Sequence, residues 1–328
     1  MKLENTKNIM VYVETANDAP VNIALEALGK AREIADETKE EVIAVLIGKD
    51  LEKLEKEIIA AGADKVVYVS QEEYQYEAYV KVLEELIKRY TPRLVIAGGT
   101  QYAKDIIPVV AKKFDTVAAV DVMKLRVEAD KNIVTCPVYG GTILNEIVIE
   151  GNPTFVLSRS GAFSKAIDAT RTGEFVKEEI SISKENLLAK IIESVKEITS
   201  SVNLEEAEVI VAGGRGMGTK ENFALVEELA KICNGVVGAT RPAIEDEWVE
   251  RTHQVGQSGK IVAPKLYIAC GVSGATQHVS GMIDSGYIIA INKDEDAPIF
   301  DIADVGIVGD VTKVMPLLIE EFKKIKEA

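Results

Sequence analysis

Two arginines set in turns between apolar segments are the residues of this sequence best suited to bind a ligand. Arg215 lies inside the glycine-rich run Gly213–Gly218, directly after an apolar segment, and Arg241 follows the hydroxyl-bearing Thr240 at the end of another. Glycine lets a backbone approach a ligand closely, and a guanidinium presents five N–H donors. The two turns therefore predict a site that is rich in hydrogen-bond donors.

Both turns also have a structural explanation. The run Gly213–Gly218 fits neither a regular GxGxxG motif nor a GxxxxGK[ST] motif, so a tight strand-to-helix turn accounts for its glycines equally well. Thr240 is placed to cap a following helix, with Pro242 just inside that helix. Capping and ligand binding are compatible roles for Thr240, and the sequence leaves both open.

Two further loops carry neutral hydrogen-bonding groups. Gln254–Lys260 combines two glycines, two glutamines and a serine, which suits the hydroxyls of a ribose or ribityl chain. In the loop Cys270–His278, Ser273 is placed to cap a helix whose free N–H groups would face a pyrophosphate. His278 would lie on the first turns of that helix, although a lone histidine is more often a surface or core residue. Cys270 is most simply a small buried hydrophobe.

Asn292 and Asp310 each follow a predicted strand. An asparagine amide can bind an amide-like edge of a ligand, and an aspartate can bind a ribose or ribityl hydroxyl. Both residue types are also ordinary turn formers, so the sequence leaves their roles open.

All of these loops follow predicted strands of a second α/β domain, and ligands of open parallel sheets bind beyond the carboxyl ends of the strands. We predict a smaller doubly wound α/β unit there. Its predicted strands are Glu208–Ala212, Val236–Ala239, Leu266–Gly271 and Tyr287–Asn292, and its predicted helices are Thr219–Cys233, Gly274–Met282 and Thr312–Lys326.

The first part of the chain predicts a parallel α/β sheet that is followed by an antiparallel extension, with Gly140-Gly141 as a hairpin turn. Its first strands are Ile9–Val13, Val42–Ile47, Val66–Val69 and Leu94–Ala97, and its helices are Asp18–Thr38, Leu51–Ala61, Glu72–Tyr90 and Tyr102–Lys113. The predicted extension consists of Val117–Val127, Ile133–Val138, Thr142–Glu150, Thr154–Ser158 and Glu174–Ile182, and Ala189–Ile198 is either a strand or a short helix.

A small, polar stretch, Thr199–Asn203, precedes an acidic pair and predicts the boundary between a domain of residues 1–200 and one of residues 201–328.

A net charge of −15 argues against nucleic acid or an anionic bilayer as the main partner. Three cysteines without CxxC spacing indicate reduced thiols and no structural zinc or iron–sulfur cluster. With no apolar run near the roughly 18 residues of a membrane span, we expect a soluble, cytoplasmic protein.

These motifs resemble the alpha subunit of electron transfer flavoproteins. Leu266–His278 together with Ile291–Asp294 resembles the signature of that family, and Gly213–Gly216 and Gln254–Lys260 resemble its other FAD loops. The resemblance is strong over the whole second domain. For the first domain it rests on the general architecture.

The resemblance implies one FAD in the second domain, with Arg215 against the isoalloxazine and the Thr240 hydroxyl near flavin N5. It places His278 near the pyrimidine carbonyl O2, and Asn292, Asp310 and Val311 along the adenosine half. It also implies a beta subunit, bound largely through the first domain, and dehydrogenases, of acyl-CoA or other substrates, as redox partners. The full set of implied FAD contacts is Arg215, Gly216, Thr240, Arg241, Val255, Gly256, Gln257, Ser258, Ser273, Gly274, Ala275, Thr276, Gln277, His278, Asn292, Asp310 and Val311.

The function expected from this resemblance is that of an electron carrier subunit, enzymatic only within a complex. A narrower hypothesis is flavin-based electron bifurcation, in which FAD on the beta subunit takes hydride from NADH and the FAD of this chain receives one electron. The alternative is a nicotinamide-nucleotide oxidoreductase subunit on a similar fold, which the missing GxGxxG opposes. A non-redox adenine-nucleotide module is a third possibility, but the first strand is followed by Glu14 and not by a glycine-rich loop.

Overall fold

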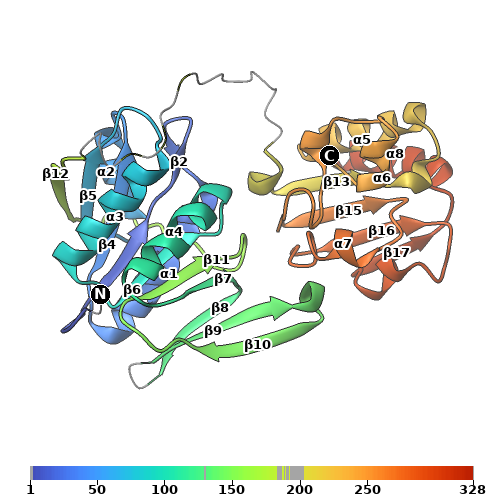
Figure 1. The fold of residues 1–328 in the computed structure, drawn as a ribbon. Helices are drawn as coiled ribbons and strands as arrows, with labels where there is room; N and C mark the ends of the chain where they lie inside the picture. Colours follow the sequence, from blue (N-terminus) through green and yellow to red (C-terminus); the bar gives the residue numbers. More distant parts are fainter. Residues whose placement is uncertain are drawn as a thin grey trace. The chain divides into compact units, whose positions relative to one another are not determined.

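The structure is a computed structural model that describes residues 3–128, 131–182, 187, 189, 192 and 203–327. The chain forms two compact units, Met1–Val195 and Lys196–Ala328 (Figure 1). The predicted boundary at residue 200, and most of Ala189–Ile198 and Thr199–Asn203, lie outside the described residues. The boundary at residue 200 therefore stays a prediction.

The first unit is built on a seven-stranded parallel sheet with the order β12-β5-β4-β1-β6-β11-β7. Its strands are β1 (Ile9–Tyr12), β4 (Val42–Gly48), β5 (Lys65–Ser70), β6 (Leu94–Gly98), β7 (Ala118–Val122), β11 (Thr154–Ser158) and β12 (Glu174–Glu178). The chain runs from β1 outward to β5 and then returns to place β6 on the other side of β1. The carboxyl ends of β1 and β6 therefore form the switch point of this sheet.

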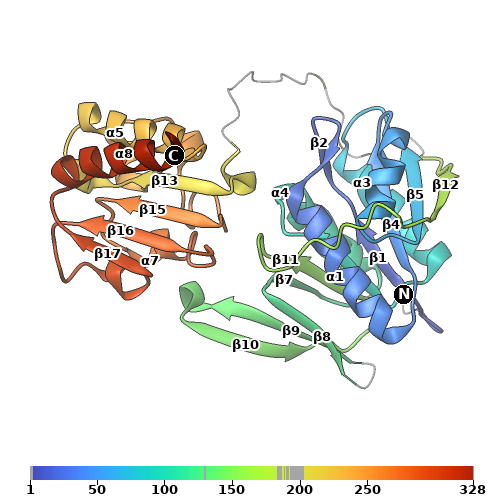
Figure 2. The ribbon, with the colours of Figure 1, turned by 180° about the vertical axis from the view of Figure 1, so that it is seen from behind.

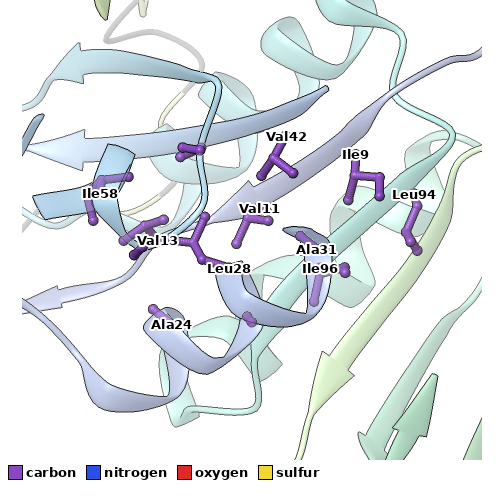
Figure 3. Packing of buried hydrophobic residues seen from close by; sticks show 14 of the residues in the cluster. Ile9, Val11, Val13, Ala24, Leu28, Ala31, Val42, Ile58, Leu94 and Ile96 are labelled. Carbon is purple, nitrogen blue, oxygen red and sulfur yellow. The ribbon is translucent and has the colours of Figure 1, made fainter. Parts of the chain in front are cut away.

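Helices cover both faces of this sheet, which explains why its strands are apolar without alternation. Ile9 and Val11 of β1 pack with Leu28 of α1 on one face (Figure 3), whereas Met10 of β1 packs against the opposite face. The helices are α1 (Asn22–Thr38) and α2 (Glu55–Ala60) on the first face and α3 (Tyr76–Tyr90) and α4 (Gln101–Lys113) on the second, with a 3₁₀ turn, η1 (Glu52–Leu54), before α2.

The antiparallel part is smaller than the sequence predicts. It consists of β8 (Lys124–Glu128), β9 (Lys131–Val138) and β10 (Ile143–Val148), with the predicted Gly140-Gly141 turn inside η2 (Tyr139–Gly141). The predicted strand Val117–Val127 is divided into β7 and β8 near Asp121, whose φ is 60°. The strands β7, β11 and β12, expected in the extension, instead join the parallel sheet, so that prediction was wrong.

Two predicted helices of the first unit begin late. Residues before α1 form the small hairpin of β2 (Thr15–Ala16) and β3 (Ala19–Pro20), and its turn residues Asn17 and Asp18 have φ values of 49° and 63°. Asparagine and aspartate tolerate this left-handed conformation, so the turn ends before the helix begins. Similarly, α3 begins at Tyr76 and not at Glu72.

The second unit is a five-stranded, all-parallel sheet with the order β14-β13-β15-β16-β17. Its strands are β13 (Val209–Gly213), β14 (Val236–Ala239), β15 (Leu266–Cys270), β16 (Ile288–Asn292) and β17 (Val305–Val308). Its helices are α5 (Lys220–Ile232), α6 (Arg241–Glu245), α7 (Thr276–Val279) and α8 (Val311–Glu327), and its 3₁₀ turns are η4 (Leu204–Glu206), η5 (Arg215–Met217), η6 (Arg251–His253) and η7 (Pro298–Asp301). The α/β fold predicted for both units is thus confirmed.

The two faces of this second sheet are covered differently. The long helices α5 and α8 lie side by side on one face (Figures 1 and 2). The other face is covered by short elements and loops that contribute Leu204, Val255, Val262 and Met282. The helix predicted over Gly274–Met282 is in fact the four residues of α7 followed by turns.

None of the helices among the described residues is both long and apolar enough to cross a bilayer. Across the same residues, no group of three or more histidine, cysteine, aspartate or glutamate side chains is placed to hold a metal ion.

Candidate functional site

The loops singled out by the sequence lie along one edge of the second sheet. All five strands are parallel, so the loops after β13, β14, β15, β16 and β17 leave from the same side. The strand order reverses between β13 and β15, because β14 lies on the outer side of β13. The loops that follow β13 and β15 therefore meet at the switch point, where open α/β sheets bind ligands.

The two glycine-rich loops at the switch point contact each other through their backbones. Gly214 N donates to Cys270 O at 2.9 Å, and Gly216 N donates to Gly271 O at 2.9 Å. A Cβ on Gly214 would lie 2.4 Å from Gly271 O. These glycines are thus required for two loops to approach each other, which is a structural role beside the ligand approach expected from the sequence.

Arg215 lies on this joined turn, at the start of η5, and its side chain is exposed. Among the described residues, no carboxylate forms an ion pair with it. Arg241 is also exposed, but its Nε lies 2.6 Å from Glu245 Oε1, one turn along α6. Of the two arginines, Arg215 is therefore the one whose charge is available to a ligand.

Thr240 has a buried hydroxyl without a partner. The residue is 7% exposed, and its Oγ1 makes no hydrogen bond with any residue that the structure describes. It occupies the N-cap position of α6, with Pro242 just inside the helix as expected, yet its side chain makes no capping bond. Since a buried hydroxyl without a partner costs roughly 1–3 kcal/mol, this group fits a site in which a ligand supplies the missing partner.

The loop Gln254–Lys260 lies beside Thr240. Val255 N donates to Ala239 O at 3.0 Å, and Gln257 N donates to Gln277 O at 2.8 Å. Val255 and Gly256 are buried, whereas the side chains of Gln257 and Ser258 are exposed at the edge. The loop thus joins the end of β14 to the segment that follows β15.

His278 is a buried histidine with both ring nitrogens engaged. Its Nδ1 lies 3.1 Å from Val255 O and its Nε2 lies 2.9 Å from the hydroxyl of Tyr267. Burial lowers the pKa of His278 to about 4, so the ring is neutral at pH 7. The geometry offers no free donor on this ring, so the expected contact of His278 with the flavin is not supported here and stays a prediction.

The segment Ser273–Gln277 does not form the helix N-terminus expected for a pyrophosphate. The helix α7 has four residues, its N-cap is Ala275, and no side chain caps it, so the capping role expected for Ser273 was wrong. Ser273, Ala275, Thr276 and Gln277 are nevertheless exposed at the edge, and Gly274 is buried against Ile299.

Asn292, Asp310 and Val311 extend the site toward β17. Asn292 Nδ2 donates to Val272 O at 2.8 Å, and Asp310 Oδ1 accepts from Thr312 N at 3.0 Å. The hydrogen bonds from Thr312 lower the pKa of Asp310. Val311, the first residue of α8, is buried in the core. Asn292 and Asp310 thus form local hydrogen bonds in turns, which is one of the two roles that the sequence left open. These turns lie at the carboxyl edge of the second sheet.

Sequence reasoning gave no role to Tyr267 and Asn222. Tyr267 is fully buried beneath His278, and Asn222 Nδ2 donates to Met217 O at 2.8 Å, which fixes the glycine-rich turn to α5. Asn222 lies three residues after Thr219, the N-cap of α5, and this position is the only signal in the sequence that could have indicated the role of Asn222.

A donor-rich edge at the switch point of a parallel sheet is typical of a dinucleotide-binding α/β protein. Comparison with known families is consistent with that class. A model described as the electron transfer flavoprotein FAD-binding domain matches residues 203–283, and one described as the electron transfer flavoprotein domain matches residues 9–183.

Curated relatives match the chain over nearly its whole length. The electron transfer flavoprotein subunit alpha of Thermoanaerobacterium thermosaccharolyticum is 43% identical and covers 99% of this chain and 100% of the relative. The subunit alpha of Megasphaera elsdenii is 42% identical, with 99% of each chain covered. The acryloyl-CoA reductase electron transfer subunit beta of Anaerotignum propionicum is 34% identical and covers 99% of this chain and 98% of the relative. The chain belongs to the electron transfer flavoprotein alpha-subunit family.

FAD is therefore the cofactor of the second unit. The residues present fit it, because the buried Thr240 hydroxyl has no partner among the described residues and the Arg215 guanidinium is exposed in another loop at the same edge of the sheet. The nicotinamide-nucleotide alternative gains no support from the family.

Proposed function

We propose that this chain is the alpha subunit of a heterodimeric electron transfer flavoprotein that carries electrons from dehydrogenases to a further redox partner. FAD, when bound, supplies the ability to accept and release electrons. Residues 201–328 form the proposed FAD domain, and residues 1–200 form the proposed docking domain for the beta subunit. The observation that carries the proposal is the buried Thr240 hydroxyl without a partner at the switch point of the second sheet.

The residues of the edge have distinct proposed roles. The exposed guanidinium of Arg215 favours negative charge on the cofactor, and the Thr240 hydroxyl donates to or accepts from it. The neutral loops bind its hydroxyls and phosphates through backbone N–H groups. The proposed contacts are Arg215, Gly216, Thr240, Arg241, Val255, Gly256, Gln257, Ser258, Ser273, Gly274, Ala275, Thr276, Gln277, His278, Asn292, Asp310 and Val311.

The test is the visible spectrum of the heterodimer made by co-expression with its beta subunit. We expect a yellow protein whose released cofactor is FAD, and whose absorbance is bleached on addition of a reduced dehydrogenase. A colourless heterodimer that fails to take up added FAD would refute the proposal.

The strand β10 supports a protein partner for the first unit. Ile143, Leu144, Ile147 and Val148 are each between 43% and 52% exposed, and Tyr139 in the preceding turn is 81% exposed. Alternate residues of a strand point to opposite faces, so both faces of this edge strand are apolar. Exposed apolar edges are aggregation sites unless they are covered, and we assign the covering to the beta subunit.

Substitution on β10 tests this assignment. Leu144→Glu should weaken association with the beta subunit by at least tenfold, because it places a charge inside the proposed interface. Leu317→Glu is the matched control, since Leu317 is 65% exposed on α8 of the other unit. Equal association of the two variants, measured by analytical ultracentrifugation, would refute the docking role of β10.

Electron bifurcation is the narrower form of the proposed function. It requires a second FAD on the beta subunit, so counting FAD in the heterodimer decides it. Two FAD molecules per heterodimer would support bifurcation, and one FAD together with one AMP would exclude it.

A further inference from the structure

Three tyrosines and an aspartate gather at the carboxyl edge of the first sheet and have no role in the function proposed above. Tyr74 lies in the loop after β5, Tyr76 begins α3, and Tyr102 and Asp105 lie in the first two turns of α4. Together they line a hollow of about 360 Å³, which we call the tyrosine hollow. Because α3 and α4 pack on the same face of the sheet, their first turns are brought together there.

The rings of the tyrosine hollow hold one another in place. The ring centroid of Tyr74 lies 4.8 Å from that of Tyr79 and 4.7 Å from that of Tyr102. Tyr79 is buried, and its hydroxyl donates to Ile47 O at 3.1 Å, so the innermost ring is fixed to β4. Tyr74 and Tyr102 remain 36% and 52% exposed. The hollow therefore presents a preorganised aromatic surface to solvent, which is typical of a binding site.

The carboxylate of Asp105 gives the tyrosine hollow a negative charge. Asp105 is exposed, and no basic side chain that the structure describes forms an ion pair with it. Two other carboxylates near these rings already accept hydrogen bonds within the unit. Glu14 accepts from the Thr100 hydroxyl, and Glu77 Oε1 accepts from Ala189 N at 3.1 Å. Asp105 is thus the carboxylate of this hollow that is available to a ligand.

The rings themselves are neutral. Burial first, and then the Asp105 carboxylate, raise the pKa of Tyr74 to about 12 and also raise the pKa of Tyr76. Lys104, the one basic residue in the first two turns of α4, does not line the hollow. Its Cε lies 3.6 Å from the position that a Cβ on Gly99 would take, in the loop after β6.

Neutral aromatic faces beside an available carboxylate favour one kind of ligand, an organic cation. The negative face of a tyrosine ring attracts an ammonium or guanidinium group, and a guanidinium can lie flat on a ring while it donates to a carboxylate. A phosphate would be repelled by Asp105, and an uncharged ligand would leave this carboxylate without a counter-ion.

We propose that the tyrosine hollow binds an organic cation, a guanidinium or alkylammonium group that lies against the rings and pairs with Asp105. The cation is carried either by a free amine or by a basic side chain of the electron-donating dehydrogenase. The site lies in the first unit and shares no residue with the FAD contacts proposed for the second. The inference therefore goes beyond the proposed function and does not depend on FAD binding.

The test uses ethylguanidinium as the probe and ethylurea, its neutral counterpart of the same shape, as the control ligand. NMR titration of the heterodimer labelled with ¹³C-tyrosine follows the ring signals, which tyrosine-to-phenylalanine variants assign. We expect ethylguanidinium to shift the signals of Tyr74 and Tyr102 with a Kd of about 1–10 mM, since so small a probe gains little binding energy. Ethylurea should bind at least about fivefold more weakly, because it lacks the charge.

Two substitutions separate the contributions of charge and ring. Asp105→Asn and Tyr102→Leu should each weaken ethylguanidinium binding by about fivefold, the effect of one lost exposed ion pair or cation–π contact. Both side chains are exposed, so the fold and the FAD content should not change. Asp115→Asn, just beyond the end of α4, is the matched control for charge, and Tyr287→Leu, 44% exposed in the second unit, is the control for an exposed ring.

Three results would each overturn the proposal. These are no ring shifts at concentrations roughly tenfold above the expected Kd, equal binding of ethylurea and ethylguanidinium, and equal binding by the two hollow variants and their controls. Where binding is found as expected, adding the reduced dehydrogenase identifies the source of the cation. Displacement of the probe supports a side chain of that protein, and retention of the probe supports a free amine. A heterodimer that lacks FAD would refute the proposed function and leave this site to be measured as before.

Discussion

The two units share one architecture and differ at the same place, the carboxyl edge of the sheet. In both units the strand order reverses beside the first strand, which creates a switch point. The edge of the second unit carries glycine-rich backbone turns and the exposed Arg215. At the switch point of the first unit, the carboxylate of Glu14 accepts a hydrogen bond from the Thr100 hydroxyl.

Aromatic and acidic side chains dominate the edge of the first unit. Tyr74, Tyr76, Tyr102 and Asp105 line a hollow of about 360 Å³. Burial first, and then the nearby Asp105 and Glu14 carboxylates, raise the pKa of Tyr74 to about 12. Carboxylates at this edge disfavour phosphate groups, whereas the edge of the second unit carries the exposed Arg215. The comparison teaches that the loops, and not the fold, decide which unit holds the dinucleotide.

The largest expected effect comes from forcing apart the two loops at the switch point of the second unit. Gly214→Ala should reduce FAD affinity by a hundredfold or more, about 3 kcal/mol, because the new Cβ would lie 2.4 Å from a backbone oxygen. FAD titration of the heterodimer measures it. Gly309→Ala is the control, since its Cβ would meet only the end of the Val314 side chain at 2.9 Å. Equal affinities would contradict the tight loop contact.

The next effect concerns pH, because both histidines of the chain lie in the second unit. The pKa of His278 is lowered to about 4 in the folded state from 6.5, so the unfolded chain binds the proton first. Stability is then complete above pH 6.5 and is lost as the pH falls toward 4, by about 3 kcal/mol at most. Hydrogen exchange of the heterodimer between pH 7 and 4.5 should show peptides of the second unit opening before those of the first.

His253→Gln should leave this acid sensitivity in place, since His253 is only half-buried. Simultaneous opening of both units as the pH falls would mean that His278 does not set the acid stability of the second unit.

A smaller effect isolates the Thr240 hydroxyl, which differs from the Thr100 hydroxyl at the switch point of the first unit because Thr100 donates to Glu14. Thr240→Val keeps the shape of the side chain and removes a buried hydroxyl that has no partner within the described part of the chain. The melting temperature without added FAD should therefore stay the same or rise, whereas FAD affinity should fall by about tenfold. Calorimetry gives both quantities. A fall in melting temperature with unchanged FAD affinity would show that the hydroxyl serves the fold alone.

An effect of similar size is expected on the redox potential. Arg215→Ala removes an unpaired cation, which should lower the one-electron flavin potential by about 60 mV, equivalent to a tenfold change in equilibrium. Arg241→Ala should shift it less, because Glu245 already neutralises Arg241. Spectroelectrochemistry compares the two variants. A larger shift for Arg241 would reverse the roles assigned to the two arginines.

The sequence predicted the alternation of strands and helices in both units, because buried parallel strands are short, apolar and followed by amphipathic helices. It was wrong on β7, β11 and β12, since the residues of a strand do not tell which strand it will pair with. The length of α7 was also wrong, because the turn residues after Ser273 serve packing against η7 and the loop Gln254–Lys260.

By itself, the sequence determined the two α/β units, their polar strand-end loops and the identity of Arg215 and Thr240 as candidate ligand groups. Only the tertiary structure decided that the Thr240 hydroxyl is buried and that Arg241 is paired with Glu245. Among the described residues it leaves the Thr240 hydroxyl without a partner and Arg215 without an ion pair, and it hydrogen-bonds His278 to Tyr267. The physical reason is that hydrogen-bond satisfaction depends on contacts between segments far apart in the chain, and local patterns of residues carry no information about such contacts.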